Sequence, residues 1–94
     1  MPKYLVERSF SVGEHQMGDV GRRSRMLTED VFPEITWHHS HVVVDGGGKV
    51  RTYCVYEAPD EDVIRRHADK LGWHTVDGIF EIAGDVTPDD FPLT

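Results

Sequence analysis

Four segments of the chain concentrate β-branched and aromatic residues in short runs, as β-strands do. They cover Lys3 to Phe10, Ile35 to Asp45, Lys49 to Glu57 and Thr75 to about Val86. Between the second and third segments, the three glycines that follow Asp45 predict a tight hairpin turn, because glycine accepts positive φ at any turn position. The pattern therefore predicts four strands, of which the middle two form a hairpin.

Two further segments repeat apolar residues at helical spacing. The first is a loop followed by a helix from about Asp19 to Phe32, which Pro33 ends. Its inward face is expected to consist of Val20, Ser24, Leu27 and Val31.

The second helix has clear start and stop signals. Pro59 and Asp60 open it, acidic residues follow in its first turn, and Gly72 comes directly after its last turn. Its predicted inward face is Val63, Ile64, His67, Ala68 and Leu71.

The order strand, helix, strand, strand, helix, strand predicts an α+β domain of the ferredoxin-like βαββαβ type. We expect a four-stranded antiparallel sheet with both helices on one face, formed by residues 1–86, and an irregular C-terminal tail over residues 87–94. The other sheet face has no helix to cover it. A domain of 94 residues buries only about 60 to 65% of its unfolded surface, so a homodimer is expected.

The net charge and the cysteine content limit which classes of partner and which compartment the sequence supports. The net charge of −7 argues against general affinity for nucleic acid phosphates and favours cations. The single cysteine, Cys54, excludes an intrachain disulfide and fits a reducing compartment. Neither a signal peptide nor a membrane-spanning run is visible in the sequence. We therefore expect a cytoplasmic protein without a membrane or nucleic acid partner.

The segment Trp37–Val44 (WHHSHVVV) contains three histidines within a predicted strand. Alternate side chains of a strand share a face, so His39 and His41 are expected on the open face together with Trp37, and His38 on the other. Two imidazoles roughly 6 to 7 Å apart form half of a transition-metal site. Imidazole suits nickel, zinc, copper and iron, so the spacing does not identify the ion.

Other donors lie on neighbouring strands. Cys54 or Tyr56 is expected opposite a histidine across the hairpin, and Glu7 joins them if it points outward. Such a mixed set suits nickel, zinc or copper. Register cannot be fixed from sequence. Simpler roles therefore remain open: surface histidines that fill space, a buried Cys54, and a core histidine at position 67.

Catalytic patterns are absent: the chain has no nucleophile elbow, phosphate loop or His-Glu-x-x-His motif. The alternative to metal binding is a dimeric small-molecule-binding module, or a cofactor-free enzyme, that uses the open face. Its aromatic pocket would consist of Trp37, Tyr53, Tyr56 and Trp73. His67 or Glu57 would serve as its general base. A scaffold that binds only itself is a third possibility.

Three blocks of sequence resemble one family of small bacterial proteins. They are Tyr4–Arg8 (YLVER), Trp37–Val42 with His39 and Ser40, and Tyr53–Glu61 (YCVYEAPDE) leading into Ile64–Ala68 (IRRHA). The family comprises single-domain ferredoxin-like proteins, once classed as a domain of unknown function and often described as nickel-binding. The first helix and the tail after Val86 depart from the family pattern.

The resemblance implies a bacterial, cytoplasmic, ferredoxin-like homodimer that binds nickel or a similar ion. The positions shared with the family are Glu7, His39, Cys54, Glu57 and His67, whereas His38 and His41 are additions in this chain.

Together these observations predict a divalent transition-metal (nickel) site with His39, His41, Glu7 and Cys54 as ligands and Glu57 and His67 in support. The protein would store, buffer or deliver the metal without catalysis. Binding should weaken below about pH 6, because neutral imidazole is the form that binds metal.

Overall fold

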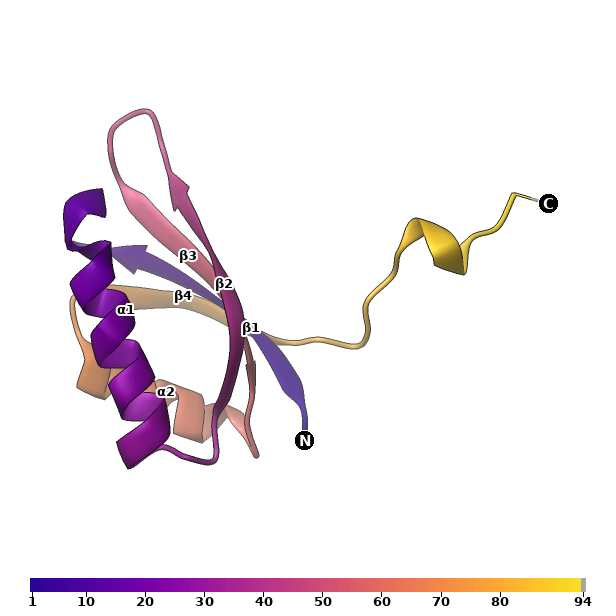
Figure 1. The fold of residues 1–94 in the computed structure, drawn as a ribbon, viewed down its shortest axis with the longest axis horizontal. Coiled ribbons are helices and arrows are strands. Elements are labelled where there is room, and N and C mark those ends of the chain that lie inside the picture. Colours follow the sequence, from indigo (N-terminus) through magenta and orange to yellow (C-terminus); the bar gives the residue numbers. More distant parts are fainter. Residues whose placement is uncertain (94) are drawn as a thin grey trace.

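The computed structural model describes residues 1–93, and its elements follow the predicted order. They are β1 (Lys3–Phe10), α1 (Met17–Met26), β2 (Thr36–Val44), β3 (Val50–Glu57), α2 (Glu61–Leu71) and β4 (His74–Glu81). The sheet has the order β2-β3-β1-β4 with all neighbours antiparallel. Both helices cover the same face, and the opposite face is open (Figure 1). The predicted ferredoxin-like α+β fold is confirmed.

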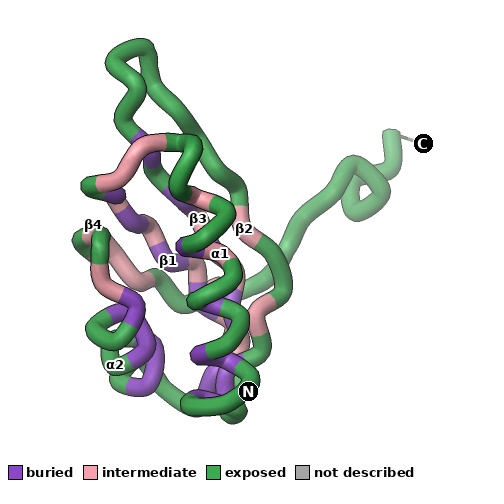
Figure 2. The backbone as a smooth tube through the Cα atoms, turned by 60° about the vertical axis from the view of Figure 1, so that its left-hand side comes forward, coloured by how far each residue is buried: buried purple, intermediate pink, exposed green. Residues whose placement is uncertain are grey.

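The core lies between the sheet and the two helices. Figure 2 shows buried positions recurring along β1 and along one side of α2, while β2 and the hairpin turn are mostly exposed. The predicted inward face of α2 is confirmed at all five positions, and Ile64 and His67 are fully buried. Asp60 caps this helix by accepting a hydrogen bond from the Val63 N–H at 3.0 Å.

The first helix differs from its predicted form. α1 begins at Met17 and continues after Met26 as a π-helical segment, Leu27–Val31. A π-turn holds more residues than an α-turn and so rotates the following side chains around the helix axis. As a result Val31 is exposed, which corrects its predicted place on the inward face, and Thr28 and Phe32 are buried.

The fourth strand ends earlier than predicted, at Glu81 instead of near Val86. The Ile82 N–H still donates to the Lys3 carbonyl at 2.8 Å. β1 begins at Lys3, so later residues find no partner strand. The chain then runs out from the open side of the sheet (Figure 1), with one short turn at Pro88–Asp90. Thr94, the last residue of the predicted tail, lies outside the described residues.

Within residues 1–93, each helix is too short or too polar to cross a lipid bilayer.

Candidate functional site

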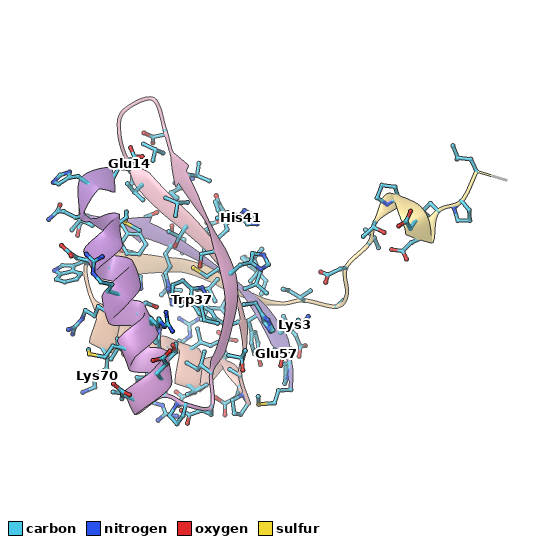
Figure 3. All side chains as sticks on the ribbon, in the orientation of Figure 1. Lys3, Glu14, Trp37, His41, Glu57 and Lys70 are labelled. Carbon is cyan, nitrogen blue, oxygen red and sulfur yellow. The ribbon has the colours of Figure 1, made fainter. Side chains whose placement is uncertain are left out.

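A β-bulge in β2 decides which side chains reach the open face. Trp37 pairs with Tyr56 and His39 pairs with Val55, which leaves His38 as an extra residue without a partner. A bulge changes the sheet face toward which the neighbouring side chains point. Trp37 therefore turns toward the helices, where its ring lies 6.5 Å from that of Tyr56 (Figure 3).

Because of the bulge, two side chains point to the opposite face of the sheet from the one predicted. His38 lies on the open face, because its Nε2 is 3.2 Å from Oε1 of Glu57, which alternates with the buried residues of β3. Trp37 lies on the helix side instead of the open face. Strict alternation fails here because the bulge inserts His38 as an extra residue between Trp37 and His39.

His39 and His41 share the open face, where the sequence places them. The pairing of His41 with Tyr53 and of His39 with Val55 puts both on the side away from the helices. Their ring centroids are 5.3 Å apart and the rings meet edge to face. Both side chains are exposed, and His41 projects away from the helices in Figure 3.

The two carboxylates predicted for the site also face this side, at different distances from the histidines. Glu57 contacts His38 through the 3.2 Å ion pair. Glu7 lies opposite Tyr53, which in turn lies opposite His41. Glu7 is therefore two strands from His41, about 10 Å at normal strand spacing. Glu7 points outward as expected, with Tyr53 of β3 lying between it and His41 across the sheet.

Cys54 and His67 lie on the other side of the sheet. Cys54 pairs with Ser40, and its side chain is buried beneath the helices. This corrects the expected pairing of Cys54 or Tyr56 with a histidine, since Tyr56 lies opposite Trp37. Among residues 1–93 no three histidine, cysteine or carboxylate side chains come together as a complete metal site.

A buried polar cluster on the helix side surrounds Arg8, which is only 2% exposed. Its Nη1 donates to the Tyr56 hydroxyl at 2.9 Å, and its Nη2 lies 3.4 Å from Nδ1 of His67. The Ser24 hydroxyl lies 3.3 Å from the other ring nitrogen of His67. Glu57 and His67, both predicted to support the metal site, lie on opposite faces of the sheet. His67 belongs instead to the core around Arg8.

Burial and charge keep the neighbours of Arg8 neutral. Burial, and secondly the positive guanidinium of Arg8, lower the pKa of His67 to about 4. Burial raises the pKa of the Tyr56 hydroxyl to about 12, although Arg8 acts in the opposite direction. At neutral pH the cluster therefore contains one positive charge and two neutral groups.

A cavity of about 220 Å³ opens beside this cluster, between α1 and the sheet. Its apolar walls are Phe10, Met17, Val20, Trp37, Val42 and Leu71. Arg8 and Tyr56 supply polar groups at its inner wall. Of the four aromatic residues in the alternative pocket, Trp37 and Tyr56 meet here, Tyr53 lies on the open face, and Trp73 follows α2. That pocket is therefore not formed on the open face.

Arg8 is the polar residue that the sequence interpretation missed. The signal was present: Tyr4, Val6 and Phe10 alternate along β1, and Arg8 occupies the same face. When three alternate residues of a strand are in the core, the remaining residue on the same face is expected to be buried too, even when its side chain is charged.

Comparison with known proteins identifies a family and a structure of similar fold. The family model described as "Nickel responsive protein SCO4226-like" matches residues 4–82. The solution structure of the C-terminal domain of the MgtC protein from Mycobacterium tuberculosis superposes with a TM-score of 0.60 at 15% identity, covering 89% of this chain and 88% of that one. This similarity concerns the fold alone. No curated protein matches the sequence.

Proposed function

Because this chain belongs to the SCO4226-like family of nickel responsive proteins, we propose that it binds nickel or a similar divalent transition ion through His39 and His41. Binding of this kind would serve storage, buffering or delivery of the metal. The observation that supports the proposal is the pair of exposed imidazoles on one face of β2, with ring centroids 5.3 Å apart.

The spacing of the two rings suits a shared ion. Two nitrogen ligands of a tetrahedral ion with bonds of about 2.0 to 2.1 Å lie roughly 3.3 Å apart. Rotation about the side-chain torsions of two exposed histidines reaches this separation from the observed ring distance of 5.3 Å. The net charge of −7 also favours the approach of a cation.

Two imidazoles are fewer donors than a stable site requires, and three or four are usual. We propose that a second copy of the chain, packed through the open face, supplies the remaining donors. Residues such as Val43 and Phe80, which are 45% and 56% exposed in one chain, would be covered by that contact. The pair His38–Glu57 and the carboxylate of Glu7 lie on the same face and would add donors or orient them.

Cys54 and His67 have no part in this proposal. Both lie on the helix side of the sheet beside Arg8, with Sγ of Cys54 3.9 Å from Nη1 and Nδ1 of His67 3.4 Å from Nη2. A divalent cation placed there would be repelled by the guanidinium charge.

We expect metal-free protein to bind nickel in calorimetric titration and to lose that binding in the double variant His39→Ala, His41→Ala. Zinc and copper titrations alongside would rank the ions. His15→Ala is the matched control, because His15 is also exposed but lies in the short helical turn Glu14–Gln16 instead of on β2. Sedimentation with and without nickel would show whether binding is linked to dimer formation.

Binding that survives in the double variant, or that the His15→Ala variant loses equally, would contradict the proposed site. Absence of binding by the unaltered protein to all three metals would contradict the function itself.

The affinity for nickel should fall as the solution becomes acidic. Metal binding requires neutral imidazole, and an ordinary histidine gains its proton near pH 6.5. Because two imidazoles must both be neutral to bind one ion, the apparent affinity should decrease by more than tenfold between pH 7.5 and about pH 5.5. Titrations in one buffer series test this, and an unchanged affinity over that range would exclude histidine coordination.

A further inference from the structure

The cavity between α1 and the sheet has a buried positive charge at its wall and no negative charge to match it. Arg8 is the one Asp, Glu, Lys or Arg side chain that is buried within residues 1–93. None of the ion pairs in this part of the chain includes it. Its Nε is buried without any hydrogen-bond partner.

A buried guanidinium without a negative partner destabilises the folded protein. Guanidinium stays protonated in proteins, and arginine is almost never fully buried unless it is paired. The Tyr56 hydroxyl and the His67 ring satisfy two of its nitrogens, but both are neutral. Cys54 adds only a long contact, with Sγ 3.9 Å from Nη1 of Arg8 and 3.5 Å from the Thr52 hydroxyl.

We propose that this cavity binds a small organic monocarboxylate with a compact apolar body. The carboxylate would supply the acceptor and the single negative charge that Arg8 lacks, and its body would contact the apolar walls around Trp37. An apolar cavity of about 150 Å³ holds benzene. The cavity here, at about 220 Å³, has room for an aromatic or short aliphatic acid.

The chemistry of the walls excludes other ligand classes. A metal ion would meet the positive charge of Arg8. A phosphate carries more negative charge than one guanidinium balances, and the remaining walls are largely apolar. A neutral apolar molecule would fit the volume but would leave the charge unmatched.

A larger residue at Gly21 of α1 would obstruct this cavity. Gly21 lines the cavity, as does the exposed Val42 of β2. A Cβ built at Gly21 meets no atom within 4 Å, so a larger residue fits there without a clash. Glycine inside a helix also disfavours helix formation by about 1 kcal/mol relative to alanine. A side chain at this position would therefore obstruct the cavity without harming the fold.

The test is calorimetric titration of metal-free protein at pH 7.5 with benzoate, phenylacetate and hexanoate, beside benzyl alcohol as a neutral match for benzoate. We expect at least one acid to bind, and benzyl alcohol to bind about tenfold or more weakly than benzoate, since a charge-assisted hydrogen bond is lost. Gly21→Leu should abolish acid binding by obstructing the cavity. Gly18→Leu is the matched control on the same helix, exposed and outside the cavity wall.

Arg8→Met removes the charge at similar side-chain length and should reduce acid binding at least tenfold. If that variant does not fold, the comparison of Gly21→Leu with Gly18→Leu decides the question. Failure of the unaltered protein to bind any of the three acids would overturn the proposal. So would equal binding of benzyl alcohol and benzoate, or acid binding that Gly21→Leu retains. The double variant His39→Ala, His41→Ala should bind acids normally, which separates this site from the proposed metal site.

Discussion

The protein should lose about 3 kcal/mol of stability between pH 6.5 and pH 4 because of His67 alone. Burial, and then Arg8, lower the pKa of this histidine to about 4 in the folded state, whereas the unfolded value is near 6.5. Over this interval the unfolded chain binds the proton more readily, so stability is fully present above pH 6.5 and falls as pH decreases. A difference of 2.5 units corresponds to about 3 kcal/mol.

The groups around His67 support this direction. Arg8 of β1 is charged, Tyr56 of β3 and Ser24 of α1 are neutral, and Phe32 contacts the ring edge to face. No carboxylate forms an ion pair with His67 within residues 1–93, and the charges of Arg8 and, to a smaller extent, His74 both oppose an imidazolium here.

Urea unfolding at intervals from pH 7.5 to pH 4 measures the effect. His67→Gln should remove most of the acid loss. A smaller loss should remain, because burial lowers the pKa of His74 in the same direction. His15→Gln changes an exposed histidine and should leave the curve as it is. An unchanged acid loss in His67→Gln would show that other groups cause it.

Ile64→Ala should destabilise the domain by about 3 to 4 kcal/mol. Ile64 of α2 is fully buried against the sheet, and truncation of such a side chain removes buried apolar surface and leaves a cavity. Domains of 94 residues have roughly 5 to 14 kcal/mol of total stability. The variant should therefore melt about 15 to 25 °C lower.

Arg65→Ala provides the comparison on the neighbouring position. Arg65 is exposed and pairs with Glu61 one helical turn earlier, at 2.8 Å. Exposed pairs of this kind contribute about 0.3 to 0.5 kcal/mol. Thermal melts of both variants test the assignment of the inward face of α2. Similar losses at the two positions would contradict it.

The helix α2 and the hairpin are examples of structure that local sequence specifies. The start at Asp60, the stop at Gly72 and the inward stripe follow from capping chemistry and helical spacing, and they match the observed helix. The first helix was less predictable, since the π-turn at Leu27–Val31 leaves no signature in residue type. It moved Val31 to the surface.

The candidate site was predictable only in part. His39 and His41 reach the open face as the sequence pattern predicts, because they lie on the same side of the bulge. His38 and Trp37 do not follow alternation, because the bulge lies between Trp37 and His39. Whether Cys54 is buried or on the open face could not be predicted for a related reason: the register that pairs it with Ser40 is a property of two strands together.

By itself, the sequence determined the number, order and type of the elements, the inward face of α2, and the presence of histidines on a strand at the surface. These depend on spacing within single segments, which neighbouring residues decide. The tertiary structure alone decided how the polar groups are divided between the two faces of the sheet. The bulge at His38 and the burial of Arg8 without an anion depend on contacts between distant segments, such as Arg8 with Tyr56 and His67. No periodicity within one segment specifies such contacts.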